Sequence, residues 1–146
     1  MIPRGAIPFE ILVVDDEPGD VELIKLALAE SRFITNVTVA CNGSVAMSIL
    51  RKEGPAYLDV PTPNLILLDL NMPQMNGREV LKAVKGDSTL ATIPVVILTT
   101  SDVERDIVAS YQLGASGYIT KPVDMDQMFR AIHGIEHYWF EVVTRP

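Results

Sequence analysis

The chain has 146 residues, 48% of them hydrophobic and 21% charged, which suits one domain with a substantial core and excludes a disordered composition. Its formal net charge of −7 argues against a nucleic-acid-binding surface, which needs clustered lysine and arginine side chains. A single cysteine, a start unlike a signal peptide and the lack of a membrane-length apolar run together predict a cytoplasmic protein without disulfides.

Short apolar runs alternate with amphipathic segments in the first half of the chain. Residues 9–14 form an apolar run typical of a strand buried on both faces, and residues 18–31 then place apolar side chains at helical spacing. Residues 36–40 predict a short β-branched strand, and Asn42 begins a second helical segment. A stretch rich in glycine and proline, residues 54–63, predicts a loop before the next strand.

The same alternation continues through the second half. Strands are predicted at residues 64–69, 94–99 and 117–120. Helices are predicted over residues 77–85, from a capping box at Ser101, and over residues 123–140.

Strand–helix units in this order predict the fold class. We expect an α/β fold in which a doubly wound, five-stranded parallel sheet carries five helices on its two faces. Residues 1–146 are expected to form a single domain, with residues 1–8 as an N-terminal extension.

Carboxylates follow two of the predicted strands directly. Asp15 and Asp16 come after the first apolar run, and Asp69 ends the third strand. Ligands of open α/β sheets bind at the carboxyl ends of the strands, so the three side chains are expected at one edge. Gathered carboxylates repel one another and need a cation or a proton between them. Taken singly, Asp15 and Asp16 also suit an acidic pair at a helix start, and Asp69 suits a turn.

Four motifs extend this pattern over almost the whole chain: Val13-Val14-Asp15-Asp16-Glu17-Pro18, Leu68-Asp69-Leu70-Asn71-Met72-Pro73 with Gly77, Val96-Ile97-Leu98-Thr99, and Gly114-Ala115-Ser116-Gly117-Tyr118-Ile119-Thr120-Lys121-Pro122. In this order and at this spacing they resemble a two-component response-regulator receiver domain. The proline-rich loop, the run Thr99-Thr100-Ser101 and the aromatic final helix resemble a narrower group. That group is the single-domain regulators that pair with cyanobacterial and other bacterial phytochrome-type histidine kinases. The resemblance implies the sheet order 2-1-3-4-5.

The resemblance also implies a phosphoryl-transfer site. Asp69 is the expected phosphoacceptor, whose carboxylate attacks a phosphohistidine on a partner kinase. Mg²⁺ is the expected cofactor, held by Asp16 and Asp69, by Asp15 through water, and by the main-chain carbonyl of Asn71. Lys121 is expected to place its ammonium against a phosphate oxygen.

A switch is implied in the same way. Thr99 is expected to offer its hydroxyl to the phosphoryl group, and Tyr118 to turn inward into the space that opens. The surface formed by the fourth helix, the last strand and the final helix would then change its preference for partners.

Other functions suit these residues less well. A Mg²⁺-dependent phosphatase of the haloacid-dehalogenase type also uses an aspartate nucleophile, but it carries a second aspartate two residues later, where this chain has Asn71. A docking module that is never phosphorylated has no need for Asp69, Thr99 and Lys121 together. The acidity of the chain argues against a DNA-binding regulator.

Several residues stay outside this scheme. The final helix ends in more aromatic residues than one face can bury, so we expect a homodimer contact or partner surface there. His133 and His137 have the spacing of a Zn²⁺ site, but no third ligand is evident. Cys41 is expected to be a small buried residue at a strand end, and Gly77 a backbone requirement.

Overall fold

The computed structural model describes residues 9–29, 35–70, 72, 75–99, 114–120, 126 and 130, with the backbone alone at residues 99 and 118–120. The strands are β1 (Phe9–Val14), β2 (Thr35–Ala40), β3 (Leu65–Asp69), β4 (Val95–Thr99) and β5 (Gly117–Thr120). The helices in these ranges are α1 (Pro18–Ala29), α2 (Gly43–Leu50) and α3 (Gly77–Gly86), and none of them has the length and apolarity to cross a bilayer. The helices predicted from Ser101 and over residues 123–140 lie outside the described residues, except that Asp126 and Arg130 are helical.

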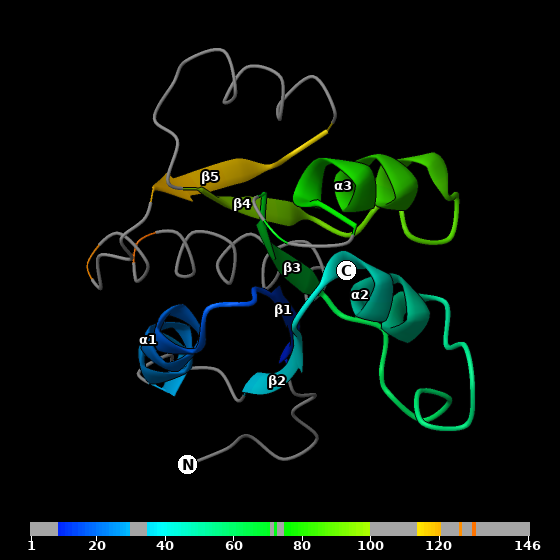
Figure 1. Cartoon of the computed structure of the whole chain (residues 1–146), viewed down its shortest axis with the longest axis horizontal. Coiled ribbons are helices and arrows are strands. Elements are labelled where there is room, and N and C mark those ends of the chain that lie inside the picture. Colours follow the sequence, from blue (N-terminus) through cyan, green and yellow to red (C-terminus); the bar gives the residue numbers. More distant parts are fainter. Residues whose placement is uncertain are drawn as a thin grey trace, which may run out of the picture.

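The strands form one parallel sheet in the order β2-β1-β3-β4-β5. Helix α1 covers one face of the sheet, while α2 and α3 cover the other (Figure 1). Helices on both faces are the mark of a doubly wound sheet, so the predicted fold class and strand order are confirmed. In this order β1, which Asp15 follows directly, and β3, which ends at Asp69, are neighbours.

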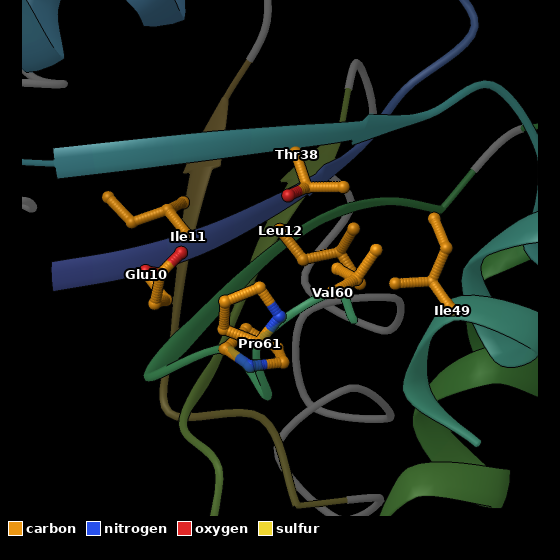
Figure 2. Close-up of a pocket in the computed structure, with 8 residues that line it drawn as sticks. Glu10, Ile11, Leu12, Thr38, Ile49, Val60 and Pro61 are labelled. Carbon is orange, nitrogen blue, oxygen red and sulfur yellow. The ribbon is translucent and has the colours of Figure 1, made fainter. Parts of the chain in front are cut away.

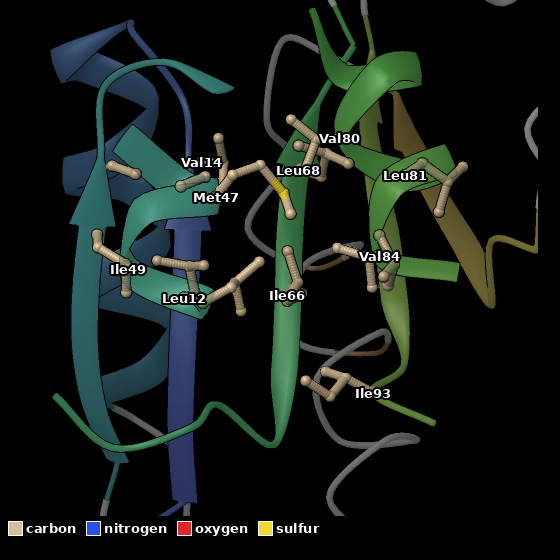
Figure 3. Close-up of a cluster of buried hydrophobic side chains, with 14 of the residues drawn as sticks. Leu12, Val14, Met47, Ile49, Ile66, Leu68, Val80, Leu81, Val84 and Ile93 are labelled. Carbon is tan, nitrogen blue, oxygen red and sulfur yellow. The ribbon is translucent and has the colours of Figure 1, made fainter. Parts of the chain in front are cut away.

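Successive side chains of the central strands pack alternately into two separate hydrophobic cores, one on each face of the sheet. Ile11 and Val13 of β1 pack on the side of α1. Leu12 and Val14 pack on the other side, against α2 and α3 (Figure 3). The first four residues of β3 divide between the two cores in the same way. Because both faces of these strands are buried, their apolar runs are continuous rather than alternating.

The predicted strand ends differ from the observed ones by one residue at three places. Strand β2 begins one residue earlier, at Thr35, whereas β3 and β4 begin one residue later. At β3 the cause is a side-chain contact, because the N–H of Glu10 donates to the Oδ1 of Asn64 at 2.8 Å. The N–H of Asn64 donates back to the carbonyl of Glu10 at 2.7 Å. The amide side chain thus replaces a main-chain acceptor, and the regular ladder starts at Leu65.

Cys41 is exposed, so the prediction of a buried cysteine is wrong. It directly follows β2, an edge strand of the sheet, in which every residue except Ala40 is exposed or half-buried. An edge strand has a neighbour on one side only, and the residue after it is therefore less covered than one that follows a central strand.

Candidate functional site

Three carboxylates meet at the carboxyl edge of the sheet. Asp15 and Asp16 follow β1 directly, and Asp69 is the last residue of β3. One carboxylate oxygen from each of them lies within 4.8 Å of the others. Asp15 and Asp69 are only 2% and 3% exposed, whereas Asp16 is exposed. The pairing of β1 with β3 brings them together, because parallel neighbours end at the same edge.

The backbone and the carboxylate of Asp15 are both fixed by hydrogen bonds. Its N–H donates to the carbonyl of Ala40 at 3.1 Å, which ties it to the end of β2. Its Oδ1 accepts the N–H of Glu17 at 2.9 Å, immediately before α1. One carboxylate therefore supports the start of a helix and also belongs to the cluster. The two interpretations that the sequence left open for Asp15 are compatible.

The donor set suits a small divalent cation. Two like charges are buried and the third lies beside them, an arrangement that needs a cation or a proton. All three groups offer carboxylate oxygen, the ligand that Mg²⁺ and Mn²⁺ prefer. Opposite ligands of Mg²⁺ lie about 4.2 Å apart, given its metal–oxygen distance. Oxygens within 4.8 Å of one another are therefore close enough to converge on one such ion, directly or through a bound water.

The backbone that follows Asp69 is held closely by the start of α3. The N–H of Leu70 donates to the carbonyl of Leu98 at 3.1 Å, and the N–H of Gly77 donates to the carbonyl of Leu70 at 3.2 Å. A Cβ on Gly77 would overlap the carbonyl oxygen of Asp69 and would lie 2.6 Å from the Cα of Leu70. Gly77 is thus required by backbone packing, as predicted.

A capping box that the sequence prediction missed begins α3. The Oδ1 of Asn76 accepts the N–H of Glu79 at 3.0 Å, and the carboxylate of Glu79 accepts the N–H of Asn76 at 3.3 Å. The signal was present as an asparagine with a glutamate three residues later. This cap fixes the point at which the loop after Asp69 becomes a helix.

Two of the other predicted site residues are placed through their backbone. Thr99 is the last residue of β4 and pairs with the last residue of β5. Because Asp69 pairs with Leu98, the main chain of Thr99 lies at the same sheet edge as the carboxylate cluster. Tyr118 lies within β5, paired with Ile97.

The remaining predicted site residues lie outside the described residues. They are Asn71, Lys121, His133 and His137, together with most of the final helix that was expected to form a homodimer contact. The predicted roles of Asn71 and Lys121 therefore rest on the family resemblance.

A small pocket, separate from the cluster of Asp15, Asp16 and Asp69, lies between β1, β2, α2 and the proline-rich loop (Figure 2). It is lined by Glu10, Ile11, Leu12, Thr38, Ile49, Val60, Pro61 and Pro63. Only Glu10 and Thr38 among these side chains are polar. A binding site usually brings several polar groups together on its ligand, so this pocket is a weaker candidate than the carboxylate cluster.

Comparison with known proteins decides the family. The profile of the response regulator receiver domain matches residues 11–133. The chain belongs to this family. It is 42% identical over 139 residues to the response regulator Rcp1 of Synechocystis sp., an overlap that covers 95% of this chain and 94% of Rcp1.

Two solved structures are similar in both sequence and fold. One is the phosphorylated cyanobacterial phytochrome response regulator RcpA, with a TM-score of 0.82, 44% identity, and coverage of 96% of this chain and 99% of RcpA. The other is the Mn²⁺-bound form of Rcp1, with a TM-score of 0.80, 42% identity, and coverage of 95% of this chain and 99% of that one. The chain is therefore a response regulator homologous to phytochrome response regulators, and the phosphatase alternative is not favoured.

Proposed function

We propose that the protein accepts a phosphoryl group on Asp69 from a histidine kinase of the phytochrome type. The observation that carries the proposal is the meeting of Asp15, Asp16 and Asp69 at the carboxyl edge of the sheet. Asp69 lies at the end of β3, the middle strand of the sheet, and β1 supplies the other two carboxylates. The similarity to RcpA, a phosphorylated phytochrome response regulator, supports both the reaction and the class of kinase.

The proposed transfer exchanges one bond to phosphorus for another. A carboxylate oxygen of Asp69 bonds to phosphorus while the bond between phosphorus and the imidazole nitrogen of the kinase breaks, and that nitrogen keeps the electron pair. The product is an aspartyl phosphate, a mixed anhydride that water hydrolyses, so the modification is reversible. Phosphorylation of Asp69 and hydrolysis of that phosphate are the two reactions proposed for the chain.

Mg²⁺ is the proposed cofactor of this step. Asp16 and Asp69 would hold it directly, Asp15 would hold it through water, and the main-chain carbonyl of Asn71 would complete the protein ligands. A divalent ion offsets the repulsion within the cluster and neutralises charge on the incoming phosphoryl group. The Mn²⁺-bound form of Rcp1 supports a divalent ion in this family of sites. Lys121 would bind a phosphate oxygen as a second positive charge.

The output of the proposed switch is a change in protein–protein contact. Thr99 would donate its hydroxyl to the phosphoryl group, and Tyr118 would move into the space that this opens. The phosphoryl group biases two pre-existing states, and a shift from 1:99 to 99:1 requires about 5.5 kcal/mol of differential interaction. The surface that responds includes β5 and the final helix, through which we also propose a homodimer.

Intact mass after incubation with a small phosphodonor and Mg²⁺ tests the proposal. We expect the wild-type protein to gain one phosphoryl group and Asp69→Asn to gain none. Asp59→Asn is the matched control, because Asp59 is an exposed carboxylate in the proline-rich loop. Chelation of Mg²⁺ is expected to suppress the gain in the wild-type and control proteins alike.

Two results would contradict the proposal. A mass gain in Asp69→Asn equal to that of the wild type would remove this residue from the role. An unmodified wild-type protein, in a preparation shown to be folded, would argue against phosphorylation altogether.

A further inference from the structure

The turn between β2 and α2 contacts both segments that carry the carboxylates. At its start, the carbonyl of Ala40 accepts the N–H of Asp15 at 3.1 Å. At its end, Gly43 lies against Met75, in the loop that leads from Asp69 to α3. Between them the Oδ1 of Asn42 accepts the N–H of Val45 at 2.8 Å and fixes Gly43 as the first residue of α2. This turn, residues 40–43, therefore joins the two halves of the carboxylate site without belonging to it.

Gly43 is buried at a point where a side chain has no room. A Cβ there would overlap the carbonyl oxygen of Met75 and would lie 2.8 Å from both the Cβ of Met75 and a methyl group of Val80. Two of these three atoms belong to or adjoin the main chain, which cannot turn away as the end of a flexible side chain can. By contrast, a Cβ on Gly86 at the end of α3 would meet no atom within 4 Å.

The segment that leads from Asp69 to α3 is fixed at both of its ends. It is closed at its base by the hydrogen bond from Gly77 to the carbonyl of Leu70, and Leu70 is bonded in turn to β4. Met72 is buried in the core beneath the loop. Met75 lies two residues before Gly77, whose backbone is packed against the main chain of Asp69, so a displacement of Met75 acts on the start of α3 and through it on Asp69.

We propose that Gly43 is a positioning residue for the carboxylate site. Its missing side chain lets α2 lie against Met75 and Val80 without displacing the start of α3, which packs on the main chain of Asp69. This inference rests on the proposed metal site and assigns it a residue that offers no ligand atom. It predicts that enlarging residue 43 weakens metal binding while Asp15, Asp16 and Asp69 all remain.

The test compares Mn²⁺ affinity, measured by titration calorimetry, with stability, measured by urea unfolding without metal. Gly43→Ala is expected to weaken Mn²⁺ binding by about tenfold, as losses of supporting contacts around metal ligands do. Gly86→Ala is the matched control and is expected to keep wild-type affinity. Leu50→Ala, a core truncation at the far end of α2, is expected to lose stability while its folded fraction keeps wild-type affinity.

A second pair of variants keeps the test decisive if Gly43→Ala does not fold. Val80→Ala removes the methyl group that the new side chain would strike, but leaves the contact with the backbone of Met75. We expect the double variant of Gly43→Ala with Val80→Ala to bind Mn²⁺ about tenfold more weakly than Val80→Ala alone.

The outcomes separate this inference from the proposed function. Equal affinity in Gly43→Ala and wild type, or in the double variant and Val80→Ala, would overturn the inference and leave the metal site intact. A folded wild-type protein that binds no Mn²⁺ would overturn the proposed metal site and the inference together.

Discussion

The amino ends and the carboxyl ends of the strands, called here the amino edge and the carboxyl edge of the sheet, carry different arrangements of charged and polar groups. At the amino edge the backbone of Glu10 pairs with Asn64, and the carboxylate of Glu10 accepts a hydrogen bond from Asn36 at 3.0 Å. On the same side the ammonium of Lys85 donates to the carbonyls of Ala91 and Ile93 at 2.9 and 2.8 Å. At the carboxyl edge three groups of the same charge lie within 4.8 Å of one another.

The amino edge stabilises the fold, whereas the carboxyl edge carries the candidate functional site. At the amino edge, hydrogen-bond donors are paired with acceptors, and these bonds hold the strands and the turn before β4 in place. Like charges at the carboxyl edge repel one another, and a bound divalent ion would offset that repulsion.

Gly77→Ala is expected to have the largest effect on stability. The new methyl group would overlap the backbone of Asp69, and overpacking of this kind destabilises by about 3 kcal/mol. Urea unfolding measures the loss. Gly86→Ala, at the open end of the same helix, is expected to be neutral or to stabilise by up to about 1 kcal/mol. Equal stability of the two variants would mean that the start of α3 is not packed closely against the main chain of Asp69.

Lys85→Met is expected to weaken the amino edge by about 1–2 kcal/mol, because two carbonyls lose a charged donor. Lys82→Met, on an exposed position of the same helix, should change stability by less than about 0.5 kcal/mol. Mg²⁺ affinity should be unchanged in both variants. A loss of Mg²⁺ affinity in Lys85→Met would show that the two edges are coupled.

The pH dependence of stability should change with Lys85 as well. Burial lowers the pKa of the Lys85 ammonium below its ordinary value of 10.5. Between the lowered pKa and 10.5 the unfolded chain binds more protons than the folded one, so this residue makes stability rise with pH in that window. Lys85→Met should remove this contribution, which urea unfolding across the window would detect. An unchanged slope would argue against burial of the ammonium.

Asp16→Asn is expected to produce the smallest change, and one of opposite sign. Without divalent ions, removing one charge from the cluster should stabilise the protein by about 1 kcal/mol, as expected for charges near 5 Å in water-like surroundings. Asp59→Asn, in the exposed loop, should have no comparable effect. Destabilisation by Asp16→Asn under these conditions would mean that the three carboxylates do not repel one another in the folded protein.

The sequence was sufficient where local pattern decides the structure. Continuous apolar runs identified the strands, and a carboxylate at the end of two of them predicted the cluster, because both features depend on period and position along one strand.

Cys41 was misjudged because its exposure depends on β2 being an edge strand. The close approach of Gly43 to Met75 joins segments that are distant in sequence, and a glycine at a helix start does not reveal which backbone will lie against it. Asn64 was predicted to be the first residue of a strand because it directly precedes an apolar run, a pattern that does not reveal that its side chain supplies the acceptor for the N–H of Glu10.

The central claim is that the carboxylate cluster holds a divalent ion, and the unfolding free energy as a function of Mg²⁺ concentration tests it most directly. The account predicts that wild-type stability rises with Mg²⁺, by about 2.7 kcal/mol when the free ion is a hundred times its dissociation constant. It also predicts that the rise is reduced in Asp16→Asn and unchanged in Asp59→Asn. A wild-type stability that does not respond to Mg²⁺, or that responds equally in Asp16→Asn, would contradict it.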